Sequence, residues 1–441
     1  MELFIVESLR YVIVLLFAVY TFYCFFGLRY TNPEKQNGVY TTQQVFTVLL
    51  HLVMSVILIM ENKSIKYIII WIIGLLFYFV FLFLYQVCYK GLSRLVFNNM
   101  MMCMMVGFVM LARLSYDYAL HQIIMASIAL GICIFVPVII EKLKILEKMG
   151  WQYAMVGIAF LMLVFIIGVE KYGSRNWISF GGIAIQPSEF VKIIFVFFIA
   201  SLLSRKLSLK KIAIVSGVAA VHVIILVLEK DLGAALIYFF TYIMVLYVAT
   251  TRIAYVFLGA IGGTGAALVA YRLFSHVRNR VIAWQDPFGH ITTSGYQVSQ
   301  SLFAIGTGGF IGLGLGKGLP TSVPVVESDF IFAAISEELG GAFAICLLLV
   351  YLSSFIMFMN IAMKMKNRFH KLTAFGLSVI FIVQVFICVG GVTKFIPSTG
   401  VTLPLISYGG SSIMSTIALF SIIQGMYVIN SKGEGDKYEE K

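Results

Sequence analysis

The sequence predicts an all-α, polytopic integral membrane protein with about thirteen transmembrane helices. Of its 441 residues, 61% are hydrophobic and only 12% are charged, which is about half the charged fraction of a soluble protein. Apolar stretches long enough to cross ~30 Å of hydrocarbon recur from end to end. The net charge of +12 does not indicate a nucleic-acid partner, because membrane proteins concentrate Lys and Arg in their cytoplasmic loops.

The apolar stretches define the helices in order. The first is followed by no small-residue cleavage pattern, so we interpret it as a retained helix rather than a signal peptide. The stretch at 329–360 is long, and we expect it to tilt or break near Gly340 and Gly341. The predicted spans are 10–28, 43–60, 67–88, 95–112, 122–140, 152–169, 188–203, 211–228, 232–250, 252–271, 329–360, 371–391 and 411–430.

Basic loops orient these helices. Alternation through the spans places three Lys/Arg clusters on one side, which the positive-inside rule makes cytoplasmic. The C-terminal tail is then cytoplasmic and the N-terminus extracytoplasmic. Asp231 and the segments 170–187, 272–328 and 391–410 lie on the outer side, and 272–328 is much too long for a simple connector. The clusters are Arg205, Lys206, Lys210 and Lys211; Lys364, Lys366, Arg368 and Lys371; and Lys142, Lys144 and Lys148.

Asp231 stands between two long apolar runs. An ionisable side chain at such a position is costly enough to suggest a function. The alternative is a plain interfacial turn, because the neighbouring Glu229 and Lys230 make the whole turn polar. This stretch alone does not decide between the two interpretations.

The segment 186–192, QPSEFVK, combines helix-start residues with a lysine in an apolar helix. Ser188 can cap a helix and Glu189 favours its positive end, so helix initiation alone can explain these residues. Lys192 lies one turn further on, where a lysine needs a partner or a polar cavity. Because Glu189 lies three residues earlier on the same face, we expect a Glu189–Lys192 pair.

A glycine-rich run extends from Gly306 to Gly318. It does not match the phosphate-binding pattern GxxxxGK[ST], because Gly318 follows Lys317 where Ser or Thr is required and Ile311 replaces the first glycine. We therefore interpret the run as a flexible or tightly turning loop.

Acidic residues follow this run, before and within the long apolar stretch. We expect Asp329 or Ser328 to cap the helix. Glu337 and Glu338 lie about two turns deeper, so at least one of them should face a cavity or a cation. Pro and Gly residues between Pro397 and Ser412 then break the chain before the last helix, which is tolerated at membrane depth only where the backbone is buried or lines a cavity.

The six cysteines and six histidines form no metal-binding pattern. The cysteines lie in or at the ends of apolar runs without paired spacing, as packing residues do. No HExxH or comparable histidine motif occurs, so no transition-metal site is predicted.

Taken together and in order, these motifs resemble the SEDS family, the FtsW, RodA and SpoVE type proteins of bacterial shape, division and sporulation. The resemblance implies a ten-helix membrane glycosyltransferase that polymerises lipid II into a growing glycan strand of peptidoglycan. It also implies a class B penicillin-binding protein as partner and an essential aspartate in a DLG motif, here Asp231. It covers about residues 95 to 430 and rests on Arg175 with Trp177, QPSEFVK, DLG, GYQ at 295–297, the glycine run, SDFIF at 328–332, EELG at 337–340 and LPLISYGGSS at 403–412.

Several departures place the chain in a divergent branch of that family. About three helices precede the family core, so we divide the chain into extra helices at 1–94, a core at 95–430 and a charged tail at 431–441. The extra helices are a candidate docking site for a partner. The local departures are Glu229-Lys230 where Gln-Pro is common, Arg175-Asn176 where paired arginines are common, Val325 after Pro324, and Ser328 in place of threonine.

The resemblance also implies the reaction, in which an α-linked glycosyl diphosphate yields a β-1,4-linked glycan. Inversion in one step needs a base for the acceptor hydroxyl, and cations suffice to stabilise the leaving diphosphate. We expect Asp231 to be the general base. A Mg²⁺ or Mn²⁺ ion could assist, although the sequence shows no site for one. The expected diphosphate-binding residues are Arg175, Lys192, Arg278, Arg280, Lys317 and Lys394, and the other expected substrate-binding residues are Glu189, Gln297, Asp329, Glu337 and Ser407.

Two other functions remain open. A flippase for a lipid-linked precursor should place ionisable groups near the bilayer midplane with access to both faces. Here the strongest cluster lies on the outer side, which favours an enzyme. A non-catalytic scaffold that recruits the transpeptidase is the third hypothesis, and the presence of Asp231 argues against it.

Overall fold

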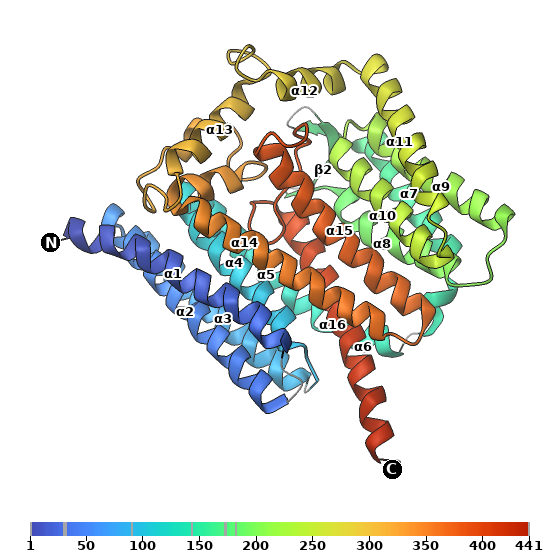
Figure 1. Ribbon diagram of the computed structural model, residues 1–441, viewed down its shortest axis with the longest axis horizontal. Helices are drawn as coiled ribbons and strands as arrows, with labels where there is room; N and C mark the ends of the chain where they lie inside the picture. Colours follow the sequence, from blue (N-terminus) through green and yellow to red (C-terminus); the bar gives the residue numbers. More distant parts are fainter. Residues whose placement is uncertain are drawn as a thin grey trace.

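The computed structural model describes the backbone of residues 2–29, 33–89, 91–142, 144–171, 174–180 and 183–439, with side chains for most of these. The protein is a helical bundle, as predicted, with a small sheet at one end (Figure 1). In the described ranges, twelve helices are long and apolar enough to cross a membrane. The shorter α8, with 17 residues, corresponds to the remaining predicted span. The bundle consists of α1 (Glu2–Arg29), α2 (Pro33–Asn62), α3 (Ile65–Cys88), α4 (Arg94–Leu114), α5 (Tyr116–Cys133), α6 (Val136–Lys142), α7 (Gly150–Ile167), α8 (Pro187–Leu203), α9 (Leu209–Leu228), α10 (Leu232–Thr250), α11 (Ala254–Leu273), α14 (Ile331–Lys364), α15 (Arg368–Val392) and α16 (Gly410–Glu439).

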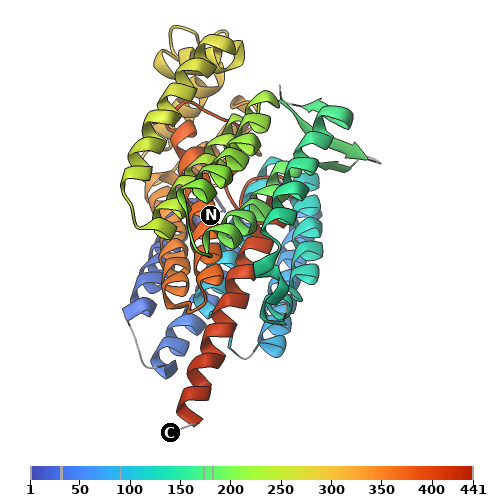
Figure 2. The same cartoon turned by 90° about the vertical axis from the view of Figure 1, so that its right-hand side faces the viewer.

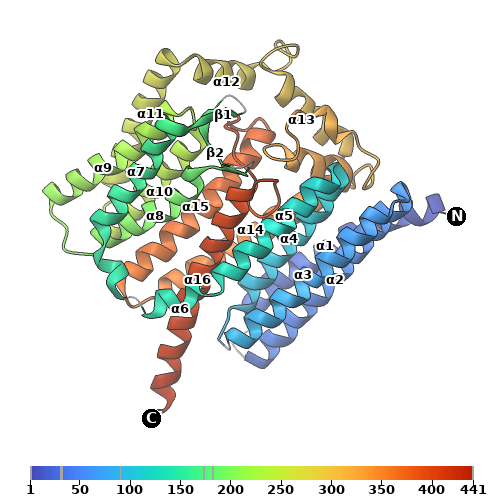
Figure 3. The same cartoon turned by 180° about the vertical axis from the view of Figure 1, so that it is seen from behind.

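The first three helices lie along one flank of the bundle, where they contact α4, α5 and α14 (Figure 1). Helix α4 is consequently buried from Leu95 to Ala112. The opposite flank is formed by α7, α9, α10 and α11, as the view from behind shows (Figure 3). Helix α11 has no buried residue, and its contacts are mainly with α10 and α12.

A three-stranded antiparallel sheet follows α7, and the sequence did not predict it. Its strands β1 (Val169–Lys171), β2 (Ser174–Phe180) and β3 (Ile183–Ile185) are arranged in chain order. Ile178 pairs with Ile185 and Phe180 with Ile183, which returns the chain to the start of α8. The sheet projects beyond the helices at the end of the bundle opposite the C-terminus (Figure 2).

The predicted loop 272–328 contains regular structure. It forms α12 (Ser275–Gln285), α13 (Tyr296–Gly308) and a 3-10 turn, η2 (Pro320–Ser322). Helix α12 crosses the end of the bundle between α11 and α13 (Figure 1). Its sequence is too polar for a transmembrane span, so hydropathy alone did not mark it as a helix.

The long helix α14 breaks at Gly340, as predicted, where φ is 85° and ψ is 168°. The glycine run packs against this break and satisfies the backbone groups that the break frees. The N–H groups of Leu313 and Gly314 donate to the carbonyls of Glu337 and Glu338, and Gly341 donates to the Gly309 carbonyl. Four glycines of the run, at 309, 312, 314 and 316, have positive φ, which confirms a tightly turning loop.

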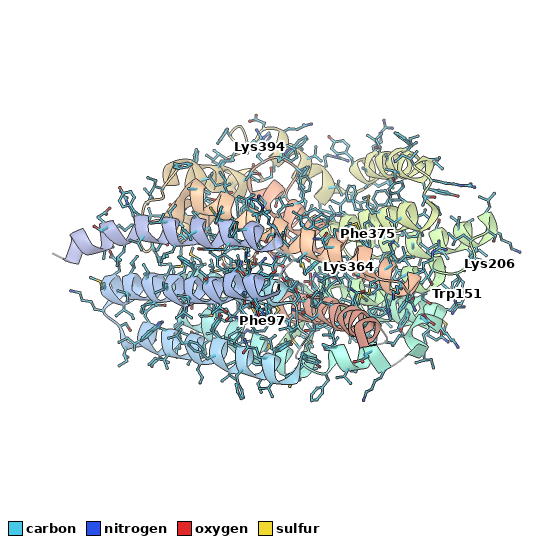
Figure 4. All side chains as sticks on the ribbon, turned by 60° about the horizontal axis from the view of Figure 1, so that its bottom comes forward. Phe97, Trp151, Lys206, Lys364, Phe375 and Lys394 are labelled. Carbon is cyan, nitrogen blue, oxygen red and sulfur yellow. The ribbon has the colours of Figure 1, made fainter. Side chains whose placement is uncertain are left out.

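The two ends of the bundle differ in the chain segments that they carry. Lys206 and Lys364 belong to the basic loops that follow α8 and α14, and Lys394 lies at the upper margin of the molecule, away from both (Figure 4). The sheet, α12, α13, the glycine run and the segment before α16 lie at the end opposite the C-terminus (Figures 1 and 2). The motifs predicted to share the outer side therefore share one end of the molecule.

Candidate active site

Asp231 is nearly buried, with 8% of its surface exposed. Its Oδ1 caps α10 by accepting the Ala234 N–H at 3.0 Å. Its Oδ2 accepts hydrogen bonds from Asn176 Nδ2 at 2.8 Å, from Gln186 Nε2 at 3.0 Å and from Ser188 Oγ at 3.0 Å. All four groups donate to the carboxylate, which as an ion can only accept hydrogen bonds. Asp231 is thus a helix cap inside a polar site rather than a residue of a plain interfacial turn.

Close packing of two chain segments holds this carboxylate in place. A Cβ atom on Gly233 would lie 2.1 Å from Val401 Cγ2, so glycine in the DLG motif lets the segment 398–402 lie against α10. Pro187 begins α8, as expected, but Ser188 does not cap that helix. Its hydroxyl donates to Asp231 instead, which explains why the predicted cap is absent.

Lys192 and Glu189 form the predicted ion pair on α8, with Nζ and Oε2 2.6 Å apart. Lys192 also donates to Gln384 Oε1 of α15 at 2.9 Å. Glu189 accepts from Ser415 Oγ of α16 at 2.8 Å. Three helices therefore share one buried polar network, which meets the need of a buried lysine for partners.

A pocket of about 380 Å³, including its open mouth, is lined by both Asp231 and the Lys192–Glu189 ion pair. Its polar walls come from the start of α8, the start of α10 and the segment before α16. The lining residues are Gln186, Ser188, Glu189, Lys192, Asp231, Ala234, Ile237, Tyr238, Gly400, Val401 and Thr402.

Arg280 and Asp329 lie on the other side of the segment 398–402. Arg280 of α12 donates from Nη1 to the Ser398 carbonyl at 2.8 Å. Gly400, with φ of 76°, faces both residues, because a Cβ there would lie 3.1 Å from Asp329 Oδ2 and 3.9 Å from Arg280 Nη2. Burial lowers the pKa of Arg280, whereas the charges of Asp329 and Asp231 raise it. Arg280 is therefore within electrostatic reach of both carboxylates.

Asp329 does not cap α14, in contrast to the expectation. The helix begins after Phe330 without a side-chain cap, and Ser328 Oγ donates to Asp329 Oδ1 at 3.0 Å instead. Burial raises the pKa of Asp329 to about 6, against the opposing effects of the Ser328 hydrogen bond and Arg280. The carboxyl is thus poised to titrate close to neutral pH.

Glu229 is a functional candidate that the sequence did not single out. It is 1% exposed, and in the described part of the chain neither carboxylate oxygen has a hydrogen-bond partner. Burial, followed by the charge of Asp231, raises the pKa of Glu229 to about 8. Its position in a polar Glu-Lys-Asp turn suggested exposure, and only the packing of the turn shows otherwise.

Several predicted site residues hold loops together and do not line the pocket. Glu337 accepts the Leu319 N–H at 3.0 Å, and Lys317 binds Glu7 at 2.7 Å. Gln297 donates to the Pro324 carbonyl at 2.9 Å, and Ser407 donates to the Ser328 carbonyl at 2.5 Å. Of the two acidic residues in α14, Glu338 meets the expected cation, Arg113, at 3.0 Å.

The remaining residues predicted to bind the diphosphate are Arg278, Lys394 and Arg175. Arg278 is exposed and donates to the Arg272 carbonyl, and the Lys394 carbonyl accepts from Trp284. Arg175 lies in β2, but its side chain is outside the described part of the structure. The described residues include no group of three or more His, Cys, Asp or Glu suited to a metal ion.

Asn176, Gln186, Ser188, Gln384 and Ser415 complete the site, and the sequence did not predict their roles. The first three belong to the motifs at 173–177 and 186–192, so their position within these motifs could have identified them as site residues. Gln384 and Ser415 lie inside apolar helices, where a lone polar residue in a hydrophobic run is the only available sign.

Comparison with known proteins agrees with this geometry. A family model described as cell cycle protein, FtsW/RodA/SpoVE, matches residues 93–431. The peptidoglycan glycosyltransferase RodA of Mycobacterium leprae is 33% identical over 344 residues, which cover 72% of this chain and 74% of that protein. Stage V sporulation protein E of Bacillus subtilis is 34% identical over 323 residues, covering 70% and 86%. A chain of a peptidoglycan synthase complex has the same fold, with a TM-score of 0.65 at 22% identity, covering 77% of this chain and 98% of that one.

Proposed function

Because the chain belongs to the FtsW/RodA/SpoVE family, we propose that it is a multi-pass membrane peptidoglycan glycosyltransferase in which Asp231 is the general base. Relatives that cover most of its length are named for this activity. The observation that carries the assignment of Asp231 is its position, since it is a buried carboxylate lining a pocket with Lys192. Arg280 is within electrostatic reach on the far side of the segment 398–402.

The proposed reaction is a single displacement on lipid II. The acceptor hydroxyl oxygen forms a bond to the anomeric carbon, and the bond from that carbon to the diphosphate breaks. The hydroxyl proton passes to Asp231, and the electron pair leaves with the lipid diphosphate. Arg280 and Lys192 supply positive charge for the leaving group.

The hydrogen bonds of Asp231 set a condition for this step. A carboxylate has about four acceptor positions, and four donors already occupy those of Asp231. An acceptor hydroxyl must therefore replace one of them. Asn176 in β2 and Gln186 before α8 are side-chain amides on non-helical segments, and we assign the displaced donor to one of these two.

The surroundings of the site extend the proposal. The polymerisation is extracytoplasmic, with the C-terminus in the cytoplasm, because residues at the starts of α8 and α10 line the pocket. The sheet that leads into α8 lies at the end of the bundle opposite the C-terminus (Figure 2). A class B penicillin-binding protein is the proposed partner, since the similar solved chain belongs to a complex that coordinates polymerization and crosslinking. The ionisable groups lie at or near the starts of α8, α10 and α14, which favours an enzyme over a flippase with a midplane site.

Glycan formation from purified lipid II tests the proposal, with the wild type compared with Asp231→Asn. Asparagine caps helices as well as aspartate does, so the variant keeps the cap of α10 but lacks the base, and its folding is checked by thermal unfolding in detergent. The matched control is Asp286→Asn, an exposed aspartate that caps a turn by accepting the Gly289 N–H. Assays include a cognate penicillin-binding protein whose own activity is blocked.

We expect polymer from the wild type and the control and none from Asp231→Asn. Equal polymer from Asp231→Asn would refute its role as base. No polymer from the wild type, with partner and divalent ions present, would refute the enzyme and favour transport or a scaffold.

A further inference from the structure

We propose that α1–α3 form a built-in brace that positions the glycine loop, residues 309–319, and through it the catalytic end of α14. These helices precede residues 93–431, the part that matches the family. The similar solved chain is covered almost completely by 77% of this protein. The three helices are therefore an addition to the shared fold, and their effect on catalysis rests on the function proposed above.

A buried polar network fastens the added helices to the core. Asn99 of α4 accepts from Tyr20 of α1 at 2.9 Å and donates to Ser353 and Ser354 of α14 at 2.8 and 3.0 Å. Asn98 of α4 donates to Gln43 of α2 at 3.1 Å. Interhelical hydrogen bonds between polar side chains drive helix association in membranes. The network thus specifies where α1 and α2 sit on α4 and α14.

An aromatic stack continues this interface toward the break in α14. The rings of Phe17 in α1 and Phe343 in α14 are stacked with their centroids 4.2 Å apart, and both side chains are fully buried. Phe343 lies three residues after Gly340, where the helix is interrupted. Helix α1 therefore packs against α14 within one turn of the break at Gly340.

The glycine loop is held from both sides. Lys317, near the C-terminal end of the loop, binds Glu7 of α1 at 2.7 Å. From the core side, the Glu338 carboxylate accepts the N–H groups of Gly316 and Gly318 at 3.1 and 3.2 Å and pairs with Arg113. The loop thus joins the added helices to the segment of α14 that precedes the break.

This segment leads directly to the site. Helix α14 begins two residues after Asp329, which lies against Gly400 and within reach of Arg280. Movement of the glycine loop would shift the start of α14 and with it Asp329, because packed helices move as rigid units. The brace therefore holds Asp329 and Arg280 in position relative to Asp231.

Charge reversal of the Glu7–Lys317 pair tests the brace in the full-length protein. The variants are Glu7→Lys, Lys317→Glu and the double exchange. The control is Lys35→Glu, which changes an exposed lysine in the first turn of α2. Hydrogen exchange of amides 309–319 reports loop order independently of activity. Glycan formation reports the catalytic consequence.

We expect each single reversal to speed loop exchange and slow polymerisation about threefold, since the pair is partly exposed. The double exchange should restore both within about twofold, and the control should change neither. Unchanged loop exchange in the single variants, or a double exchange that restores nothing, would overturn the brace. If the wild type makes no polymer, the proposed function fails while the exchange data still decide the brace.

Discussion

At the scale of single residues, the Asp231 carboxylate divides its hydrogen bonds between two purposes. One oxygen caps the first turn of α10, and the other accepts from three neutral donors, Asn176 of β2 and the closely spaced Gln186 and Ser188 at the start of α8. Such donors fix the carboxylate in position without neutralising it. Because Asp231 is nearly buried, its electrostatic interaction with Arg280 is only weakly screened by salt.

Removing one of these donors should slow catalysis more than it disturbs the fold. We predict that Ser188→Ala lowers kcat for glycan formation about tenfold, because a hydrogen bond to a charged group contributes about 1.5 kcal/mol or more. Ser378→Ala is the matched control, since Ser378 is also buried and, among the described residues, its hydroxyl bonds only to the Ala374 carbonyl of its own helix. Equal kcat values for the two variants would show that the Ser188 bond does not support the base.

Glu229 makes stability depend on pH. The unfolded chain releases this proton near pH 4.5, whereas the folded protein holds it up to about pH 8. The unfolded state therefore binds fewer protons between these values, and the free energy of unfolding falls as pH rises. We predict that Glu229→Gln, which keeps the shape of the protonated side chain, gains up to about 5 kcal/mol over the wild type above pH 8 and little near pH 4.5.

Thermal unfolding in detergent between pH 5 and pH 9 measures this difference. Glu61→Gln, which removes an exposed carboxylate at the end of α2, is the control and should track the wild type throughout. A constant offset between Glu229→Gln and the wild type at all pH values would contradict the assignment of a buried, titrating carboxyl.

At the scale of elements, the break in α14 and the glycine loop form one structural unit. The break frees backbone groups that the loop satisfies with hydrogen bonds, as interrupted backbone at membrane depth requires. A Cβ on Gly340 would lie 2.3 Å from the Gly312 nitrogen, and its φ of 85° disfavours any other residue. The glycines of two separate motifs therefore depend on one another.

We predict that Gly340→Ala destabilises the protein by about 2 kcal/mol or more, since it combines a positive φ with a backbone clash. The measurement is the unfolding midpoint in detergent. Gly217→Ala in α9 is the control, because a Cβ there meets nothing within 4 Å and alanine favours the helix by about 1 kcal/mol. A stable Gly340→Ala protein would mean that the chain closes the break in another way.

At the scale of the whole molecule, hydropathy predicted the helices because the bilayer imposes a length and a composition on every span. The same rule explains the errors, since α12 and α13 are polar or short and lie outside the spans. The three strands carry no alternation clear enough to detect. Lone polar residues in apolar runs, such as Asp231 and Lys192, indicated the site because burying them requires compensation.

The parts of the site that sequence reasoning missed depend on contacts between distant segments. Gln384 and Ser415 reach Lys192 and Glu189 only because α15 and α16 pack on α8. Lys317 and Glu337 looked similar to the pocket residues by composition and position, yet they serve the glycine loop. Residue type and depth show that a side chain needs a partner, whereas the packing decides which one it has.

Three helices, an odd number, precede α4 in the chain. The beginning of α1 therefore lies beside Lys317, whereas α4 begins at the other end of the bundle, where Ser93 bonds to Gln424 of α16. A chain that started at α4 would have both its ends in the same compartment. We predict that reporters placed before α1 and after α16 sample different compartments, which a topology assay on intact cells would measure.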